Sequence, residues 1–273
     1  LSGTLDLIHY TVQHSRPTLY FEVNQILHIL HRSAREILGD QFVGMYLYGS
    51  LSSGDFDPKT SDIDFLVVTE NLPPDATITA LEAMHDRIWA GGQKWAAKLE
   101  GSYVPRDLIR AHDPNGPACP TVNEAKFFVD QRGSDWIIQR HVIREQGVVI
   151  EGPDPKSLID PVSADAIRGA VLGVLREWWF PMLDDPSWLR DHEAGDRAFA
   201  VITMCRVLHA LEHGTIVSKP KAMSWACAKL EEPWPALIKR AGTVTNTNGE
   251  DILLDEVLCF IRHVMNVIRG SSH

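Results

Sequence analysis

The stretch Tyr48–Val68, which reads YGSLSSGDFDPKTSDIDFLVV, decides the fold class predicted for this chain. Gly49 and Ser50 interrupt one apolar segment, and a second apolar segment begins with DIDFLVV. Alternate side chains of a strand point to the same face, so Asp62 and Asp64 project together while the apolar residues between and after them face a core. The stretch therefore predicts two buried strands, with a pair of carboxylates at the start of the second.

Two carboxylates on one face of a strand can hold a hard cation. Magnesium takes oxygen ligands and is commonly held by one or two carboxylates plus substrate phosphates. A loop at Gly49 and Ser50 could approach those phosphates and donate to their oxygens through amides and a hydroxyl. A surface turn with solvated acids is the alternative, but an unpaired charge beside an apolar strand costs several kcal/mol. We therefore predict that Asp62 and Asp64 bind Mg²⁺ and present a nucleoside triphosphate.

The flanking sequence predicts two domains. Gly152 and Pro153 mark a seam, and only helical spacing recurs beyond it. We expect an α/β (α+β) domain with a mixed sheet over residues 1–152 and an all-α helical-bundle domain over residues 153–269. Residues 270–273 resemble the remnant of a purification tag. Strands are expected at residues 42–48, 63–69, 99–104, 126–130 and 147–151, and helices at residues 19–38, 78–98, 136–145, 164–178, 195–213, 221–230 and 251–268.

Composition narrows the class of partner. Hydrophobic residues make up 44% and charged residues 23% of the 273 residues, which is typical of a globular protein. The formal charge of −10 disfavours a nucleic-acid partner and favours a cationic small molecule. The four cysteines lack metal-binding spacing, and no apolar run is long enough to span a membrane. We expect a cytoplasmic monomer with reduced thiols.

The order Gly49-Ser50, Gly54, Ser61-Asp62-Ile63-Asp64 resembles the signature of the DNA polymerase β-like nucleotidyltransferase superfamily. The local amino-acid sequence of this motif is most similar to that of aminoglycoside nucleotidyltransferases of the streptomycin/spectinomycin 3''(9)-O-adenylyltransferase type. The likeness covers most of the chain. The resemblance implies Mg²⁺-dependent transfer of AMP from ATP to a hydroxyl of an aminoglycoside antibiotic, with release of pyrophosphate and resistance to the drug. It also implies that the motif residues, Ser61 included, bind the nucleotide.

The same resemblance assigns a general base. In that family a strand glutamate after a leucine accepts the proton of the substrate hydroxyl, and Leu99-Glu100 falls at a similar place. Glu100 could accept this proton, help to bind the metal, or do both. An exposed strand acid is the other interpretation. Asp130, on another expected strand, is a less favoured third carboxylate.

The helical half resembles the C-terminal domain of the family. By this resemblance Arg206 and Lys219 contact the triphosphate across the cleft between the domains, and Asp196 meets an amine of the substrate. From the residues alone, Arg206 lies on an otherwise apolar helix face, where a buried guanidinium needs an anionic partner. That partner could equally be a structural acid.

An aromatic and acidic segment could receive the acceptor. Trp178 and Trp188 could lie beneath a polycationic sugar whose ammonium groups meet carboxylates. The alternative is core tryptophans beside a solvated acidic loop. The family's substrate-contacting tryptophan has no clear counterpart, Trp136 being one possibility. The segment also contains Trp179, Glu177, Asp184, Asp185, Asp191, Glu193 and Asp196.

Two other classes of function stay open at this point. A nucleotidyltransferase of the same fold could modify a protein or tRNA, although the acidic composition argues against RNA. A catalytically silent nucleotide-binding protein is the second, although Asp62, Asp64 and Glu100 are all present. The pairs His28 with His31 and His209 with His213 have helical spacing but no third ligand, so zinc is not expected.

Overall fold

The computed structural model describes residues 17–191, 194–244 and 252–270, and it contains a mixed six-stranded sheet. The strand order is β5-β4-β3-β2-β1-β6. β2 and β3 run parallel, whereas all other neighbours are antiparallel, which confirms the predicted mixed sheet. The strands are β1 (Phe42–Leu47), β2 (Ile63–Thr69), β3 (Leu99–Pro105), β4 (Cys119–Asn123), β5 (Lys126–Asp130) and β6 (Val148–Glu151).

Helices cover both faces of this sheet. α1 (Phe21–Leu38) and α3 (Asp75–Ala90) pack on the face that carries Ile63 and Phe65. α5 (Asp135–Gln146) packs on the opposite face, against Tyr46 and Leu66. Side chains alternate along β2, so Asp64 lies on the same face as Leu66 and α5. Two short helices, α4 (Arg106–Arg110) and α6 (Pro155–Leu158), complete this layer.

The parallel register of β2 and β3 brings two acids together. Asp64 pairs with Glu100, one row after the pair formed by Ile63 and Leu99. Because paired residues of neighbouring strands share a face, both carboxylates lie at the same edge of the sheet and on its α5 side.

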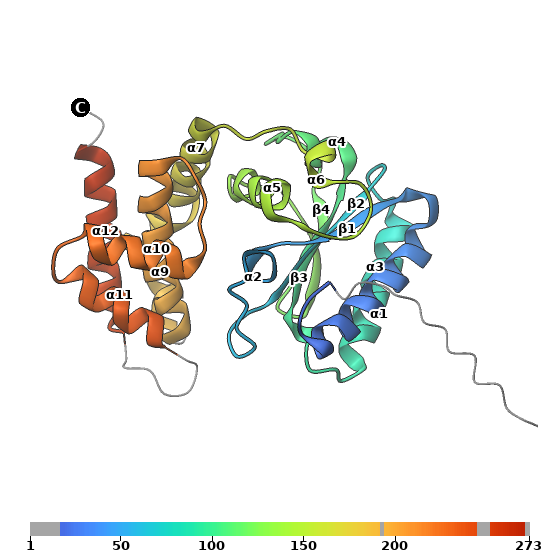
Figure 1. Cartoon of the computed structure of the whole chain (residues 1–273), viewed down its shortest axis with the longest axis horizontal. Helices are drawn as coiled ribbons and strands as arrows, with labels where there is room; N and C mark the ends of the chain where they lie inside the picture. The colour runs from blue at the N-terminus through green and yellow to red at the C-terminus, as the bar shows by residue number, and fades with distance from the viewer. Residues whose placement is uncertain (1–16, 192–193, 245–251, 271–273) are drawn as a thin grey trace, which may run out of the picture.

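The C-terminal half consists of helices that surround α9. α9 (Ala194–His213) buries Val201, Met204, Cys205 and Leu208 against its neighbours. Figure 1 shows these helices beside the sheet, with α5 between the two parts. The other elements are α7 (Ala164–Val174), a π-helical turn η3 (Leu175–Trp179), the 3-10 turn η4 (Pro181–Leu183), α8 (Ser187–Asp191), α10 (Lys219–Lys229), α11 (Trp234–Thr243) and α12 (Leu254–Gly270).

Two expectations about local structure were wrong. The helix expected at 78–98 ends at Ala90, because the following Gly91 and Gly92 break it and Gly92 adopts a positive φ. A 3-10 turn η2 (Ala96–Lys98) then leads into β3. The loop expected after Tyr48 starts instead with a short helix, α2 (Gly49–Ser53).

β4 was also missed, because three prolines and a glycine within residues 112–120 predicted a loop there. Pro120 is tolerated in β4 because the ladder to β3 involves only Thr121 and Val122. α4, α6, α8 and α11 were not predicted either.

The hydrophobic clusters suggest a later division of the chain than the predicted seam at Gly152. Leu158 and Ile159 pack in the cluster that contains Tyr46 of the sheet. The cluster of the helical half begins with Ile167. We therefore propose a domain boundary between residues 159 and 167. Gly270 ends α12, and the rest of the expected tag remnant lies outside the described residues.

None of the helices in the described ranges has the length and apolar composition needed to cross a membrane.

Candidate active site

Three acidic side chains gather where β2 and β3 begin. Asp64 and Glu100 are both half-buried neighbours in the parallel ladder, and Asp62 directly precedes β2. Asp62 accepts a hydrogen bond from Lys98, with 3.0 Å between Nζ and Oδ1. Sequence reasoning missed this lysine, which directly precedes β3 just as Asp62 directly precedes β2.

Burial and neighbouring charges both affect the pKa values of these acids. Burial raises the pKa of Asp64 to about 8, and the negative charges of Glu100 and Asp62 contribute to the rise. Burial likewise raises the pKa of Glu100 to about 7, again with a contribution from Asp62. Burial is the larger cause of both shifts, and repulsion among the three carboxylates adds to it. A bound divalent cation would relieve this repulsion.

Gly49 makes room for the carboxylate of Asp64. Its φ is 62°, and a Cβ placed on it would lie 2.0 Å from Oδ2 of Asp64. The amide of Tyr48 donates to the backbone oxygen of Asp64 over 3.2 Å, which holds the two segments together. Ser50 continues into α2, where its backbone oxygen accepts from the amide of Asp55. Gly49 therefore serves close packing against Asp64, beyond the predicted approach to phosphate.

Gly49→Ala is expected to lower both turnover and stability. The new methyl group would displace Asp64, and alanine is strained at the positive φ of this position. A strained residue of this kind costs about 1–3 kcal/mol, and displacement of Asp64 should reduce turnover at least about tenfold. Thermal melting and initial rates would measure the two effects. Gly54→Ala is the matched control, since Gly54 also has a positive φ but no atom within 4 Å of an added Cβ. Equal losses of turnover in both variants would contradict the packing role.

Ser61 organises the loop that precedes β2. Its hydroxyl accepts from the amide of Asp57 over 3.0 Å, and its own amide donates to the backbone oxygen of Asp57 over 2.9 Å. A role of Ser61 in nucleotide binding stays a prediction.

Two cations of the helical half interact electrostatically with the acids. Burial lowers the pKa of Arg206 on α9, and the charge of Asp64 opposes this effect. Burial and the charge of Arg206 lower the pKa of Lys219, the first residue of α10, whereas Asp64, Asp62 and Glu100 oppose this. In the described parts of the chain, Nε of Arg206 is buried without a hydrogen-bond partner, and Arg206 forms no ion pair. A buried, unsatisfied guanidinium facing carboxylates is suited to an anionic ligand between them.

Comparison with known proteins agrees with this geometry. A spectinomycin 9-adenylyltransferase of Campylobacter jejuni is 24% identical over 81% of this chain and 83% of that protein. One of Staphylococcus aureus is 22% identical over 91% of this chain and 95% of that protein. In fold, the chain is similar to a crystal structure of spectinomycin adenyltransferase AAD(9) from Enterococcus faecialis with ATP and spectinomycin. The TM-score is 0.71, with 18% identity over 89% of this chain and 97% of the other.

Two family models match successive parts of the chain. The model for a nucleotidyltransferase domain matches residues 31–107, which contain Asp62, Asp64 and Glu100. The model for the C-terminal domain of aminoglycoside adenylyltransferase matches residues 157–266, which contain Arg206 and Lys219. Together, the two models and the relatives support an aminoglycoside nucleotidyltransferase. The resemblance noted in the sequence is confirmed, and so is the prediction that the chain is an enzyme.

Tyr48 is a site residue of this nucleotidyltransferase that sequence reasoning did not single out. Burial raises its pKa well above the usual value, and the charges of Asp64 and Glu100 raise it further. Its hydroxyl donates to Oε1 of Gln139 on α5 over 3.5 Å. Tyr48 thus connects the acids to α5. Its only signal in the sequence is its place before Gly49.

The predicted acceptor residues of the nucleotidyltransferase lie in the helical half. Trp178 is 49% exposed, and its ring lies 5.8 Å from that of Trp188 in an edge-to-face contact. Trp188 is partly buried and packs on the C-terminal core. Asp196 lies half-buried in the first turn of α9. Their contact with an acceptor stays a prediction, and Glu193 lies outside the described residues.

Two residues that were less favoured as site residues, Asp130 and Trp136, lie where contact with the acids or with a substrate is disfavoured. Asp130 is exposed and pairs with Cys119 on β4, whereas the row next to Glu100 contains Val122. The strand register therefore separates Asp130 from the acids. Trp136 is only 2% exposed and packs in the core between the sheet and α5, which argues against contact with a substrate.

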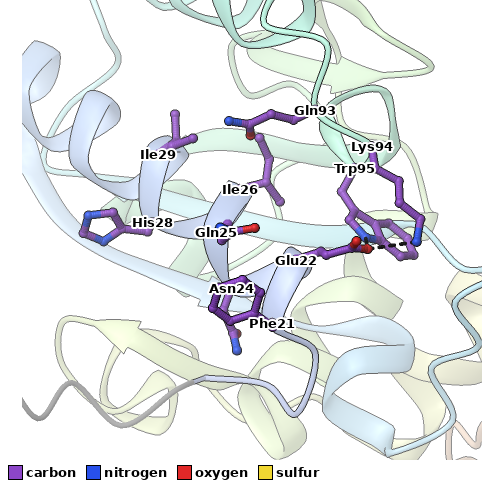
Figure 2. Close-up of a pocket in the computed structure, with 10 residues that line it drawn as sticks. All are labelled: Phe21, Glu22, Asn24, Gln25, Ile26, His28, Ile29, Gln93, Lys94 and Trp95. Carbon is purple, nitrogen blue, oxygen red and sulfur yellow. Dashed lines mark hydrogen bonds and ion pairs between the residues drawn. The ribbon is translucent and has the colours of Figure 1, made fainter.

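Two pockets are not lined by Asp62, Asp64 or Glu100. Figure 2 shows one of about 590 Å³ between α1 and the segment Gln93–Trp95, where Glu22 accepts from Lys94. It contains none of the predicted site residues. The second, of about 610 Å³, lies where the two halves meet and is lined by His112, Pro114, Asn115, Gln131, Arg132, Gly133, Ser134 and Glu177.

Proposed function

We propose that this chain transfers AMP from ATP to a hydroxyl of an aminoglycoside-type antibiotic, with release of pyrophosphate, and thereby confers resistance. The observation that carries the proposal is the convergence of two sets of charges. Asp64 and Glu100 come from the sheet, and Arg206 and Lys219 from the helices around α9. Carboxylates opposite cations can bind a metal and a triphosphate together.

The cations supply binding and alignment of the nucleotide. Arg206 and Lys219 would contact phosphate oxygens of ATP and neutralise their charge, in place of their present electrostatic partner Asp64. The backbone at Gly49 and Ser50, with Ser61 nearby, would complete the phosphate site. These helices, which we regard as a bundle around α9, would thus act as the second wall of the nucleotide site.

The residues present fit a magnesium ion. Asp62 and Asp64 offer hard oxygen donors. The pKa of Asp64 is raised by burial and by the charges of Glu100 and Asp62, and a bound cation would offset both effects. Across the described ranges, no three His, Cys, Asp or Glu side chains are already arranged as a metal site. Two carboxylates suffice when phosphate oxygens and water complete the coordination. When bound, Mg²⁺ would supply charge neutralisation at the triphosphate.

Glu100 would act as the general base. The acceptor oxygen forms a bond to the α-phosphorus of ATP while its proton passes to the carboxylate of Glu100. The bond from the α-phosphorus to the oxygen bridging to the β-phosphate breaks, and pyrophosphate leaves with that electron pair. A pKa of about 7 suits a base that must accept a proton near neutral pH.

The acceptor is proposed to be a cationic antibiotic such as spectinomycin, the compound in the names of the relatives. Asp196 would meet an ammonium group of this acceptor, and Trp178 and Trp188 would lie against its rings. The net charge of −10 favours such a cation.

The test is to incubate the protein with labelled ATP, MgCl₂ and a panel of aminoglycosides that includes spectinomycin and streptomycin. Formation of AMP-modified drug with equal amounts of pyrophosphate supports the proposal. Labelling of protein or tRNA alone would point to the alternative acceptors, and ATP binding without turnover on any acceptor would point to a silent nucleotide-binding protein.

Arg206→Met is expected to raise the KM for ATP about tenfold, the usual scale for losing one charge-assisted hydrogen bond. Stability should not fall, because the substitution removes a buried cation that lacks a hydrogen-bond partner. Steady-state kinetics and thermal melting would measure these effects. Arg262→Met, at an exposed position of α12, is the control that should change neither. An unchanged KM for ATP in Arg206→Met would exclude the phosphate contact.

A further inference from the structure

One contact joins the two halves of the chain directly. Ser134, just before α5, donates its hydroxyl to Oε1 of Glu177 over 2.6 Å. The amide of Ser134 also donates to Oε2 of the same carboxylate over 3.3 Å. Glu177 belongs to η3, which continues α7 of the helical half. A carboxylate at the start of a helix is stabilised by the free amides and by the helix dipole.

Gly173 of α7 gives this contact its close fit. A Cβ placed on Gly173 would lie 2.1 Å from the hydroxyl oxygen of Ser134 and 2.6 Å from its Cβ. A Cβ on Gly133 would come within 3.3 Å of Oε2 of Glu177. The two halves therefore approach each other closely where neither glycine has a side chain.

The contact lies between the two sets of charged residues. On one side, α5 bonds through Gln139 to Tyr48, whose amide is bound to Asp64. On the other side, α7 packs against α9, which carries Arg206. Figure 1 shows α5 between the sheet and these helices. The Ser134–Glu177 contact is therefore part of a chain of contacts that connects Asp64 to Arg206.

We propose that Ser134 and Glu177 are positioning residues whose contact across Gly173 sets the distance between the acids of the sheet and the cations of α9 and α10. This role in nucleotidyl transfer rests on the proposed function. The contact itself does not, because it is a property of the fold. Loss of the contact would let the halves separate, and the triphosphate would then lose simultaneous contact with both walls.

The first measurement is the distance between the halves. A donor and an acceptor dye are attached to a Lys126→Cys variant and to the native Cys259, both exposed, one in each half. The parent and a control, Arg176→Ala, should give the same narrow distribution of transfer efficiency. Arg176 neighbours Glu177 and is exposed, so its loss leaves the contact intact. Glu177→Ala and Gly173→Ala should both shift or broaden the distribution toward longer distances.

A double variant separates this contact from a general loss of structure. In Gly173→Ala the new methyl group meets Ser134, and Ser134→Gly removes the two atoms that it would meet. The double variant Gly173→Ala/Ser134→Gly should therefore give the same distribution of transfer efficiency as Ser134→Gly alone. The additional shift caused by Gly173→Ala should be absent from it. Without such relief in the double variant, the proposed fit at Gly173 is wrong.

The second measurement is kinetic. Glu177→Ala should raise the KM for ATP or lower kcat/KM about tenfold, as expected for losing hydrogen bonds to a charged group, while Arg176→Ala stays at the parental value. Unchanged distances in Glu177→Ala and Gly173→Ala would overturn the proposal. Changed distances with unchanged kinetics would overturn the positioning role. If the parent modifies none of the antibiotics, shifted distances still support the contact and only the proposed function fails.

Discussion

Asp64→Asn is expected to abolish AMP transfer and, at pH 8 and above, to raise the melting temperature of the ligand-free protein. Removal of a metal-binding carboxylate should reduce turnover by about a thousandfold or more. The gain in stability arises because burial and the neighbouring Glu100 and Asp62 make the ionised form of Asp64 unfavourable, as its pKa of about 8 shows. Asparagine has a similar shape but carries no charge.

The pH dependence of this gain follows from linkage. The folded-state pKa of Asp64 is raised, so the folded protein holds a proton that the unfolded chain releases near pH 4. The contribution of Asp64 to stability is thus present at low pH and is lost as the pH rises toward 8. Asp64→Asn should therefore melt near the wild-type temperature at pH 4 to 5 and above it at pH 8 to 9. A shift of about four pKa units corresponds to at most about 6 kcal/mol, so the difference at high pH should be several kcal/mol.

The matched control for this result is Asp130→Asn. Asp130 is an exposed aspartate of the same sheet, but the strand register keeps it away from Glu100. Its variant should retain activity and show no gain in stability at pH 8. Full activity of Asp64→Asn would refute the proposed metal site, and a pH-independent change in melting temperature would refute the electrostatic explanation.

Glu100→Gln is expected to reduce kcat by about 10²- to 10⁴-fold, the range typical of losing a general base. The wild-type kcat/KM should rise with pH through about 7, because Glu100 must release its proton before it can accept one from the acceptor. The glutamine variant should lack this rise. Its affinity for ATP should stay within a few-fold of wild type. A large loss of Mg²⁺ or ATP affinity, with the pH profile retained, would instead identify Glu100 as a metal ligand.

Glu124→Gln provides a control for which the direction of the change in the pKa of Glu100 is predicted. Glu124 is exposed in the turn between β4 and β5, and its negative charge helps to raise the pKa of Glu100. Neutralising it should keep kcat near the wild-type value and move the rise in kcat/KM to slightly lower pH. Steady-state rates of the wild type, Glu100→Gln and Glu124→Gln, measured from about pH 5.5 to 9, would show whether Glu100 is the general base.

Much of the sheet could be predicted because it follows from short-range pattern. β2 was expected over the residues that form it, since its apolar run begins directly after Asp62. The elements that were missed depend on context. β4 contains a proline that is accepted only because its ladder to β3 is short, and Gly91 with Gly92 ended α3 earlier than its apolar spacing suggested.

The sequence by itself determined the alternation that places Asp64 on the face opposite Ile63 and Phe65, together with the helical character of the second half, because both depend on residues two to four positions apart. Only the tertiary structure decided that Glu100 stands beside Asp64, that Lys98 pairs with Asp62, and that Arg206 and Glu177 approach the sheet. These contacts join strands or halves distant in the chain. Their geometry follows from strand register and from packing at α5, which no local periodicity encodes.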